Sequence, residues 1–180
     1  MIFRETKLPG AFIIEPARLE DERGSFARTF CQREFESRGL NPRVAQCSLS
    51  INRTAGTLRG LHYQAPPHAE AKLVSCVKGE VYDVIVDLRD SSPTRQEWAG
   101  VVLSEANGWA LYVPEGFAHG FLTLTDDATL HYQLSEFHHP ESARGVRWND
   151  PALGIEWPRP PVVISPRDQA FELLDPCESS

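Results

Sequence analysis

Residues 60 to 79 read GLHYQAPPHAEAKLVSCVKG, a stretch that begins and ends with glycine. It carries two histidines, an acidic residue and a lysine directly ahead of an apolar run. Histidines and a carboxylate in front of a strand are typical of a metal site, because imidazole nitrogen and carboxylate oxygen are common metal ligands. The rest of the chain decides whether this stretch binds a metal.

Strand signals dominate the chain downstream of this stretch. AKLVSCV alternates small or polar residues with apolar ones, and EVYDVIVDL is rich in Val and Ile. Further short runs follow, separated by Gly, Pro, Asn and Asp: GVVLS, WALYVP, GFLTLT and TLHYQLSEF. Many short strands with regular turns predict an all-β antiparallel sandwich or barrel.

Helix signals are few, and we expect only a few short peripheral helices. CQREFESRGL is the one early candidate, with Phe30 and Phe35 as apolar anchors and Gly39 as its end. Residues 151–180 are rich in proline and then briefly helical, which predicts a C-terminal wrap on the same domain. A length of 180 residues and the absence of repeats or linkers predict one domain over residues 1–180.

Composition excludes several classes of partner. The formal net charge is -7 and the pI is near 5.4, so we expect no nucleic-acid or membrane partner. The N-terminal segment MIFRETKLPGAF has no cationic segment followed by an apolar core, so we expect no signal peptide. The cysteines Cys31, Cys47, Cys76 and Cys177 form no CxxC pair, which predicts reduced thiols in a cytoplasmic protein.

A second stretch, GWALYVPEGFAH from Gly108 to His119, resembles the second motif of the cupin jelly rolls. The opening stretch has the frame of the first cupin motif, but its ligand positions are changed. Pro66 stands at the first His position, His68 at the second and Lys72 at the Glu position. The resemblance implies a cupin-type double-sheet jelly roll. Since an ammonium has no lone pair to donate, we expect no metal, and a metal cupin is only an alternative.

The remaining side chains suggest acid–base chemistry. Strand alternation over LRGLHYQ would place His62 on one face and Arg59 on the other, and Lys72 would share a face with Val74 and Cys76. A histidine beside a lysine offers a general base and a cation for a developing oxyanion. The competing interpretation is a core histidine and a solvated lysine at a strand edge.

Longer stretches resemble the dTDP-4-dehydrorhamnose 3,5-epimerase family from about Phe12 to Asp168. They are GTLRGLHYQ, AKLVSCVKGEVYDVIVDLRDSSPT, LYVPEGFAHGF, HYQLSEF, RGVRWNDPALGIEWP and ISPRD. The resemblance implies that His62 is the catalytic base, Asp168 its partner and Tyr132 the general acid. It implies that Lys72 is the cation near the keto oxygen of the sugar.

The same resemblance implies a substrate-binding set. Arg23 and Arg59 would bind the diphosphate, which planar guanidinium groups hold well. Phe26, Gln46 and His119 would line the site, and His138 would stand near the nucleotide base. From the residues alone, Arg23 is better explained as a turn residue, and an outward strand charge is the alternative for Arg59. Asp83 either lines the site or is a buried carboxylate with a hydrogen-bonding role.

We therefore predict a cofactor-independent epimerase that inverts C3 and C5 of a dTDP-4-keto-6-deoxyglucose-type sugar through an enolate. The resemblance also implies a homodimer with exchanged N-terminal strands. Departures from the family pattern lie around the pocket: Ala27-Arg28, CSLS after Gln46, and Phe137-His138. They leave open a single-position epimerase, a 3,4-ketoisomerase or a non-catalytic sugar-nucleotide-binding cupin.

Overall fold

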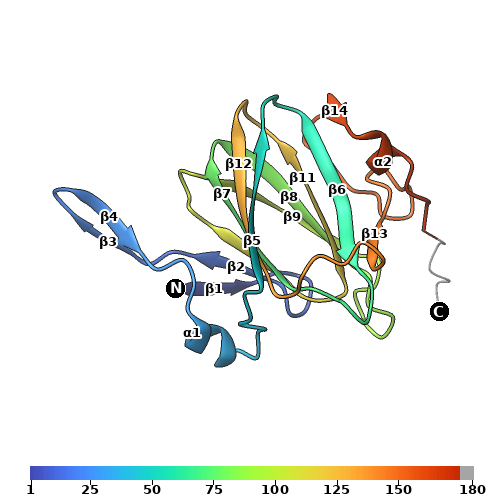
Figure 1. Cartoon of the computed structure of the whole chain (residues 1–180). Coiled ribbons are helices and arrows are strands. Elements are labelled where there is room, and N and C mark those ends of the chain that lie inside the picture. The colour runs from blue at the N-terminus through green and yellow to red at the C-terminus, as the bar shows by residue number, and fades with distance from the viewer. Residues whose placement is uncertain (175–180) are drawn as a thin grey trace.

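The computed structural model describes residues 1–174 as two β-sheets that face each other (Figure 1). The first sheet has the order β1 (Ile2–Glu5), β2 (Phe12–Glu15), β10 (Ala110–Val113), β7 (Lys72–Lys78), β12 (Ala128–Leu134) and β5 (Gln46–Asn52). The second has the order β13 (Ala143–Gly145), β6 (Thr57–Gln64), β11 (Phe117–Thr123), β8 (Glu80–Asp87) and β9 (Trp98–Ser104), with β14 (Val163–Ile164) also paired to β6. The predicted all-β double-sheet jelly roll is confirmed.

The core between the sheets explains the apolar alternation of the strands. Val74 and Leu130 from the first sheet pack in one buried cluster with Ile85 and Phe121 from the second. Each of these four side chains is at most 2% exposed. Full burial of one such side chain stabilises the fold by roughly 1.5–3 kcal/mol, so this layer is a main source of stability.

The outer face of the second sheet is also covered, which explains why EVYDVIVDL reads as nearly continuous apolar sequence. Val84 and Val86 of β8 point to this face and pack with Val146 and Leu153 from the C-terminal part of the chain. In Figure 1 this part, drawn in orange and red, lies along β6 and includes the short helix α2 (Pro166–Gln169). Residues 175–180 of the predicted wrap, with Cys177, lie outside the described residues.

The predicted early helix is confirmed as α1 (Gln32–Glu36). Phe35 is buried and contacts Phe30, with ring centroids 4.9 Å apart, and packs against the outer face of the first sheet through Tyr112. Gly39 follows the helix with φ +69°, a left-handed conformation that glycine adopts without steric cost.

A separate hairpin, β3 (Arg18–Asp21) and β4 (Gly24–Ala27), projects from the body of the molecule (Figure 1). Its large apolar side chains are mostly open to solvent, Leu19 at 73% and Phe26 at 75% exposure. Over residues 1–174 none of the helices has the length and apolar character needed to cross a membrane.

Candidate active site

His62 of β6 and Asp168 of α2 form a hydrogen-bonded pair. Asp168 Oδ1 lies 2.8 Å from His62 Nε2, and Asp168 Oδ2 accepts a hydrogen bond of 3.1 Å from the Gly60 amide. Burial would raise the pKa of Asp168, but the hydrogen bond and charge of His62 and the Gly60 amide hold it below its ordinary value. An ionised Asp168 keeps a proton on Nε2, so Nδ1 of His62 is free to accept one.

The sequence around Asp168 places this carboxylate accurately. Ser165 caps α2, since its Oγ accepts a 3.1 Å hydrogen bond from the Asp168 amide, and Pro166 occupies the first turn. Val163 and Ile164, just before the cap, pair with β6 in parallel. The tail is therefore fixed to the strand that carries His62.

The prediction that Arg59 and His62 face opposite sides of β6 is wrong. His62 pairs with His119 of β11, whereas Arg59 pairs with Phe121, so the two residues of β6 between these pairs lie opposite one residue of β11. This extra residue is a β-bulge, which turns both side chains toward the same cavity. Arg59 Nε donates a 2.8 Å hydrogen bond to Asn52 Oδ1, which orients the guanidinium.

Glycine is required where β6 and β11 meet at the bulge. Gly60 has φ +142°, and a Cβ built on it would lie 2.6 Å from Gly120 Cα. A Cβ on Gly120 would lie 2.8 Å from the Arg59 carbonyl oxygen. The local shape that aligns Arg59 with His62 therefore depends on two glycines.

Tyr132 lies on β12, in the sheet opposite His62, and lines the same cavity. Burial raises its pKa well above 10, and the charge of Asp83 raises it further, while Arg59 acts in the opposite direction. The phenol is therefore protonated at neutral pH and suits the role of a proton donor. His62 and Tyr132 thus reach the cavity from opposite sheets, which would let a base and an acid act on opposite faces of a bound ring.

His119 and Asp83 form a second buried pair on the second sheet. His119 Nε2 lies 2.9 Å and 3.0 Å from the two carboxylate oxygens of Asp83, and both residues are at most 4% exposed. The His119 ring contacts Tyr132 edge-on, with centroids 5.8 Å apart. Of the two interpretations of Asp83, the structure favours the buried carboxylate that holds a neighbour.

Lys72 begins β7 and points into the cavity, on the same face as Val74 and Cys76, as predicted. It is 7% exposed, so the interpretation of a solvated lysine at a strand edge is wrong. Its Nζ donates a 3.1 Å hydrogen bond to the His62 carbonyl oxygen, which couples the cation to the strand of the base. A fixed ammonium in a nearly water-free wall can stabilise a negative oxygen.

These side chains surround a cavity of about 300 Å³ that opens between the two sheets. Its wall comprises Ser48, Leu49, Ser50, Arg59, His62, Glu70, Lys72, His119, Phe121, Tyr132, Leu134 and His138. The predicted residue Gln46 lies beside it, and its Oε1 accepts a 2.7 Å hydrogen bond from the His138 amide. His138 lines the mouth of the cavity.

Arg23 and Phe26 are not brought to this cavity within one chain. Both belong to the projecting hairpin, where the Arg23 side chain is 84% exposed and bonded to Asp21. Their assignment as substrate-binding residues stays a prediction that depends on a second chain.

Sequence reasoning missed two charged residues near His62 and Lys72. Arg167 lines a groove of about 520 Å³ that also contains Arg59, His62 and Asp168. Glu70 lies in the cavity wall next to Lys72. Arg167 stands directly before Asp168 in the ISPRD motif, so the motif could have indicated it. Glu70 lies in the segment between two predicted strands, where no motif or periodicity marks it.

One cluster of metal-ligating side chains occurs within residues 1–174: His68, His139 and Glu141. The two imidazole rings are stacked, with centroids 3.5 Å apart and planes inclined by 5°. Imidazole lone pairs lie in the ring plane, so two parallel rings cannot both direct a lone pair at one ion. This arrangement does not suit a metal.

Comparison with known proteins agrees with this geometry. The family model for dTDP-4-dehydrorhamnose 3,5-epimerase matches residues 5–175. The chain belongs to the dTDP-4-dehydrorhamnose 3,5-epimerase family. It is 45% identical over 175 residues to the dTDP-4-dehydrorhamnose 3,5-epimerase of Methanothermobacter thermautotrophicus, covering 96% of this chain and 94% of that one.

Two solved structures of 3,5-epimerases show the same architecture. The enzyme from Elizabethkingia anophelis NUHP1 has a TM-score of 0.93 and 42% identity, with 96% of each chain covered. The dTDP-6-deoxy-D-glucose-3,5-epimerase from Legionella pneumophila, solved with dTDP-4-keto-L-rhamnose, has a TM-score of 0.89 and 41% identity, covering 96% of this chain and 92% of that one. The predicted family and fold are confirmed.

Proposed function

We propose that this family member epimerises a dTDP-4-keto-6-deoxyglucose-type nucleotide sugar at C3 and C5, for rhamnose-type deoxysugar biosynthesis. The observation that carries the proposal is the placement of an Asp-supported histidine and a protonated tyrosine on opposite sheets of one cavity. Lys72 lies in the same wall. The arrangement provides a base, an acid and a cation around one sugar ring.

The reaction begins at the carbon next to the ketone. Nδ1 of His62 takes the C3 proton, and the electron pair moves into an enolate whose charge rests on the C4 oxygen. Lys72 stabilises that oxygen, and one preorganised donor of this kind contributes about 3–4 kcal/mol. Tyr132 then delivers a proton from the other ring face. Solvent removes the extra proton from His62 and returns one to Tyr132, and a second cycle at C5 then completes the double inversion. The ketone activates both carbons, so the chemistry requires no cofactor.

Substrate anchoring is proposed for the arginines beside the base. Arg59 and Arg167 line one groove with His62, and paired guanidinium groups suit a diphosphate. His138 at the cavity mouth can stack on a nucleotide base. Ser48 and Ser50 also line the cavity and offer two small hydroxyls to a bound sugar.

The test incubates the protein with dTDP-4-keto-6-deoxyglucose in D₂O and follows the sugar by proton NMR. Deuterium at both C3 and C5 with inverted products is the expected result. Deuterium at C3 or C5 alone would replace the proposal with a single-position epimerase, and a 3-keto product would identify a ketoisomerase. If no deuterium enters the sugar, whether it is carried by dTDP or by another nucleotide, epimerase activity is refuted. The remaining alternative is then a non-catalytic sugar-nucleotide-binding protein.

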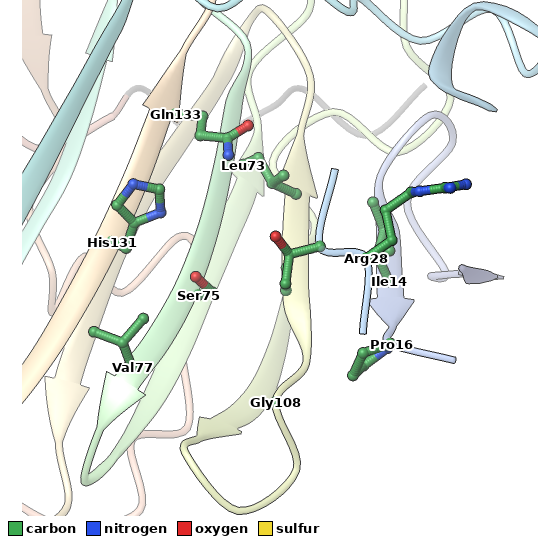
Figure 2. Close-up of a pocket in the computed structure, with 11 residues that line it drawn as sticks. Ile14, Pro16, Arg28, Leu73, Ser75, Val77, Gly108, His131 and Gln133 are labelled. Carbon is green, nitrogen blue, oxygen red and sulfur yellow. The ribbon is translucent and has the colours of Figure 1, made fainter. Parts of the chain in front are cut away.

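We also propose that the chain acts as one cupin-like domain in a homodimer with exchanged N-terminal strands. The outer face of the first sheet carries the exposed side chains Ile51 and Val77, at 66% and 52% exposure. A hollow on this face is lined by residues of β2, β10, β7 and β12 and by Arg28 (Figure 2), and its volume is about 120 Å³. In this hollow Gln133 Oε1 is buried without a hydrogen-bond partner among the described residues, which suits a donor from a second subunit.

In such a dimer, the projecting hairpin would carry Arg23 and Phe26 to the partner's cavity. Mixing Arg23→Ala chains with His62→Ala chains tests this, because one intact site forms only if the two residues come from different subunits. Recovered activity in the mixture is expected, and no recovery in a demonstrated heterodimer would refute the exchange. A cytoplasmic location is proposed as well, since Cys31, Cys47 and Cys76 are free thiols.

A further inference from the structure

A buried carboxylate stands beside the proposed oxyanion-stabilising lysine. Glu70 precedes β7 by two residues, and its Oε1 lies 3.2 Å from Lys72 Nζ. The two side chains are 10% and 8% exposed. An ammonium that leaves water this completely needs a counter-charge, and within residues 1–174 Glu70 is the carboxylate in contact with it.

Lys72 has two contacts that hold its ammonium in place. Its Nζ donates a 3.1 Å hydrogen bond to the His62 carbonyl oxygen and forms an ion pair with Glu70 Oε1 at 3.2 Å. We infer that Glu70 is a positioning residue that, together with the His62 carbonyl, directs the Lys72 ammonium at the keto oxygen of the substrate. This inference rests on the proposed function.

Glu70 is itself held from the opposite side. Gln64 Nε2 lies 3.3 Å from Glu70 Oε2, and the same amide group donates to the carbonyl oxygens of His68 at 3.0 Å and Phe137 at 3.1 Å. Gln64 is 3% exposed, and its Oε1 accepts a 2.6 Å hydrogen bond from the His139 amide. The position of the carboxylate is therefore fixed by the segment next to His138, at the mouth of the cavity.

This arrangement gives a distinct kinetic expectation. An enolate oxygen is negative only after proton abstraction, so the direction of the Lys72 ammonium matters more in the transition state than in the bound substrate. Misplacement of a catalytic group by about 1 Å can lower a rate about 100-fold. Loss of Glu70 should therefore lower kcat much more than it changes KM.

The first experiment compares Glu70→Ala and Glu70→Gln in the D₂O exchange assay. Glu70→Ala should lower kcat by about 10- to 100-fold with KM within about threefold. Glu70→Gln retains an oxygen that can accept from Lys72, and should recover most of that loss. A raised KM with unchanged kcat would overturn the inference, because it would mean that Glu70 contacts the substrate directly. An unchanged kcat in Glu70→Ala would also overturn it.

The second experiment needs no substrate. The chain has three lysines, and Lys7 and Lys78 are exposed, so NMR of ¹⁵N-lysine-labelled protein should show one slowly exchanging ammonium signal from Lys72. The signal should vanish in Lys72→Met, which assigns it, and be lost or displaced in Glu70→Ala. Its persistence unchanged in Glu70→Ala would refute the contact.

The matched control is Glu136→Gln, which changes a partly buried carboxylate that bonds Arg43 at 2.8 Å instead of Lys72. Neither kcat nor the Lys72 signal should change in it. Absence of activity in the wild-type protein would refute the proposed function, whereas the NMR comparison would still decide whether Glu70 positions the lysine.

Discussion

Replacement of Asp168 by Asn tests the assignment of the catalytic base. In the native site one carboxylate oxygen faces His62 Nε2 at 2.8 Å and the other accepts from the Gly60 amide at 3.1 Å. Asn keeps the shape but has only one oxygen. If that oxygen remains with Gly60, the new NH₂ group faces Nε2, which must then accept, and the imidazole proton moves to Nδ1.

That tautomer cannot take a proton from the sugar. The opposite amide orientation restores the tautomer but sets two donors, the amide NH₂ and the Gly60 N–H, against each other. An unsatisfied buried donor costs roughly 1–3 kcal/mol, and the lost hydrogen bond between carboxylate and imidazolium costs roughly another 1.5–3 kcal/mol. The sum, roughly 2.5–6 kcal/mol, corresponds to a loss of about 10²- to 10⁴-fold in rate.

The assay is the initial rate of deuterium incorporation at C3, measured at saturating substrate and pH 7. Circular dichroism and thermal melting should show that Asp168→Asn remains folded, because Ser165 still caps the helix and β14 still pairs with β6. Exchange within about fivefold of the wild-type rate in a folded variant would refute the role of Asp168 in setting the tautomer.

Four further changes extend these expectations. Tyr132→Phe should slow formation of the inverted product by about 100-fold or more while C3 exchange persists; equal loss of both would contradict its role as acid. Lys72→Met should lower the exchange rate about 10²- to 10³-fold in a folded protein, and an unchanged rate would exclude Lys72 as the oxyanion partner. Gly120→Ala should destabilise the fold by about 1–3 kcal/mol, seen as a lower Tm, because its Cβ would lie 2.8 Å from a carbonyl oxygen; an unchanged Tm would contradict the close approach. Buried Asp87 has a pKa lowered to about 2: burial opposes this shift, but the hydrogen bonds of Arg89 and its neighbours outweigh it, so its stabilisation is present above pH 4 and lost toward pH 2. Asp87→Asn should therefore lower the Tm at pH 7 and flatten its decline between pH 4 and pH 2, and a parallel shift at all pH values would refute this link.

Much of the fold could be predicted because strand alternation and turn residues are local signals. The alternation that placed Lys72 with Val74 on one face of β7 holds, since β7 is regular there. The same rule failed for Arg59, because a bulge depends on the register with β11 and not on β6 alone. Pairing with a distant strand is not visible in the residues of one strand.

The catalytic pair shows a second limit of sequence reasoning. His62 and Asp168 are 106 residues apart, and only the resemblance to the family linked them. Glu70 had no motif to mark it, and its role depends on a burial and a distance that exist only in the folded chain. The assignment of Arg23 and Phe26 to the site depends on a second chain.

The attachment of the tail to β6 has a consequence for how activity is lost. Asp168 is held in position by a two-residue strand, β14, and lies in a four-residue helix, α2. The jelly roll, in contrast, is built from strands of up to eight residues. Segments with few contacts detach at lower free energy than the core of a protein. On heating, catalytic activity should therefore be lost at a lower temperature than the spectroscopic signal of the sheets. The temperature at which substrate turnover stops would then report the detachment of the tail alone.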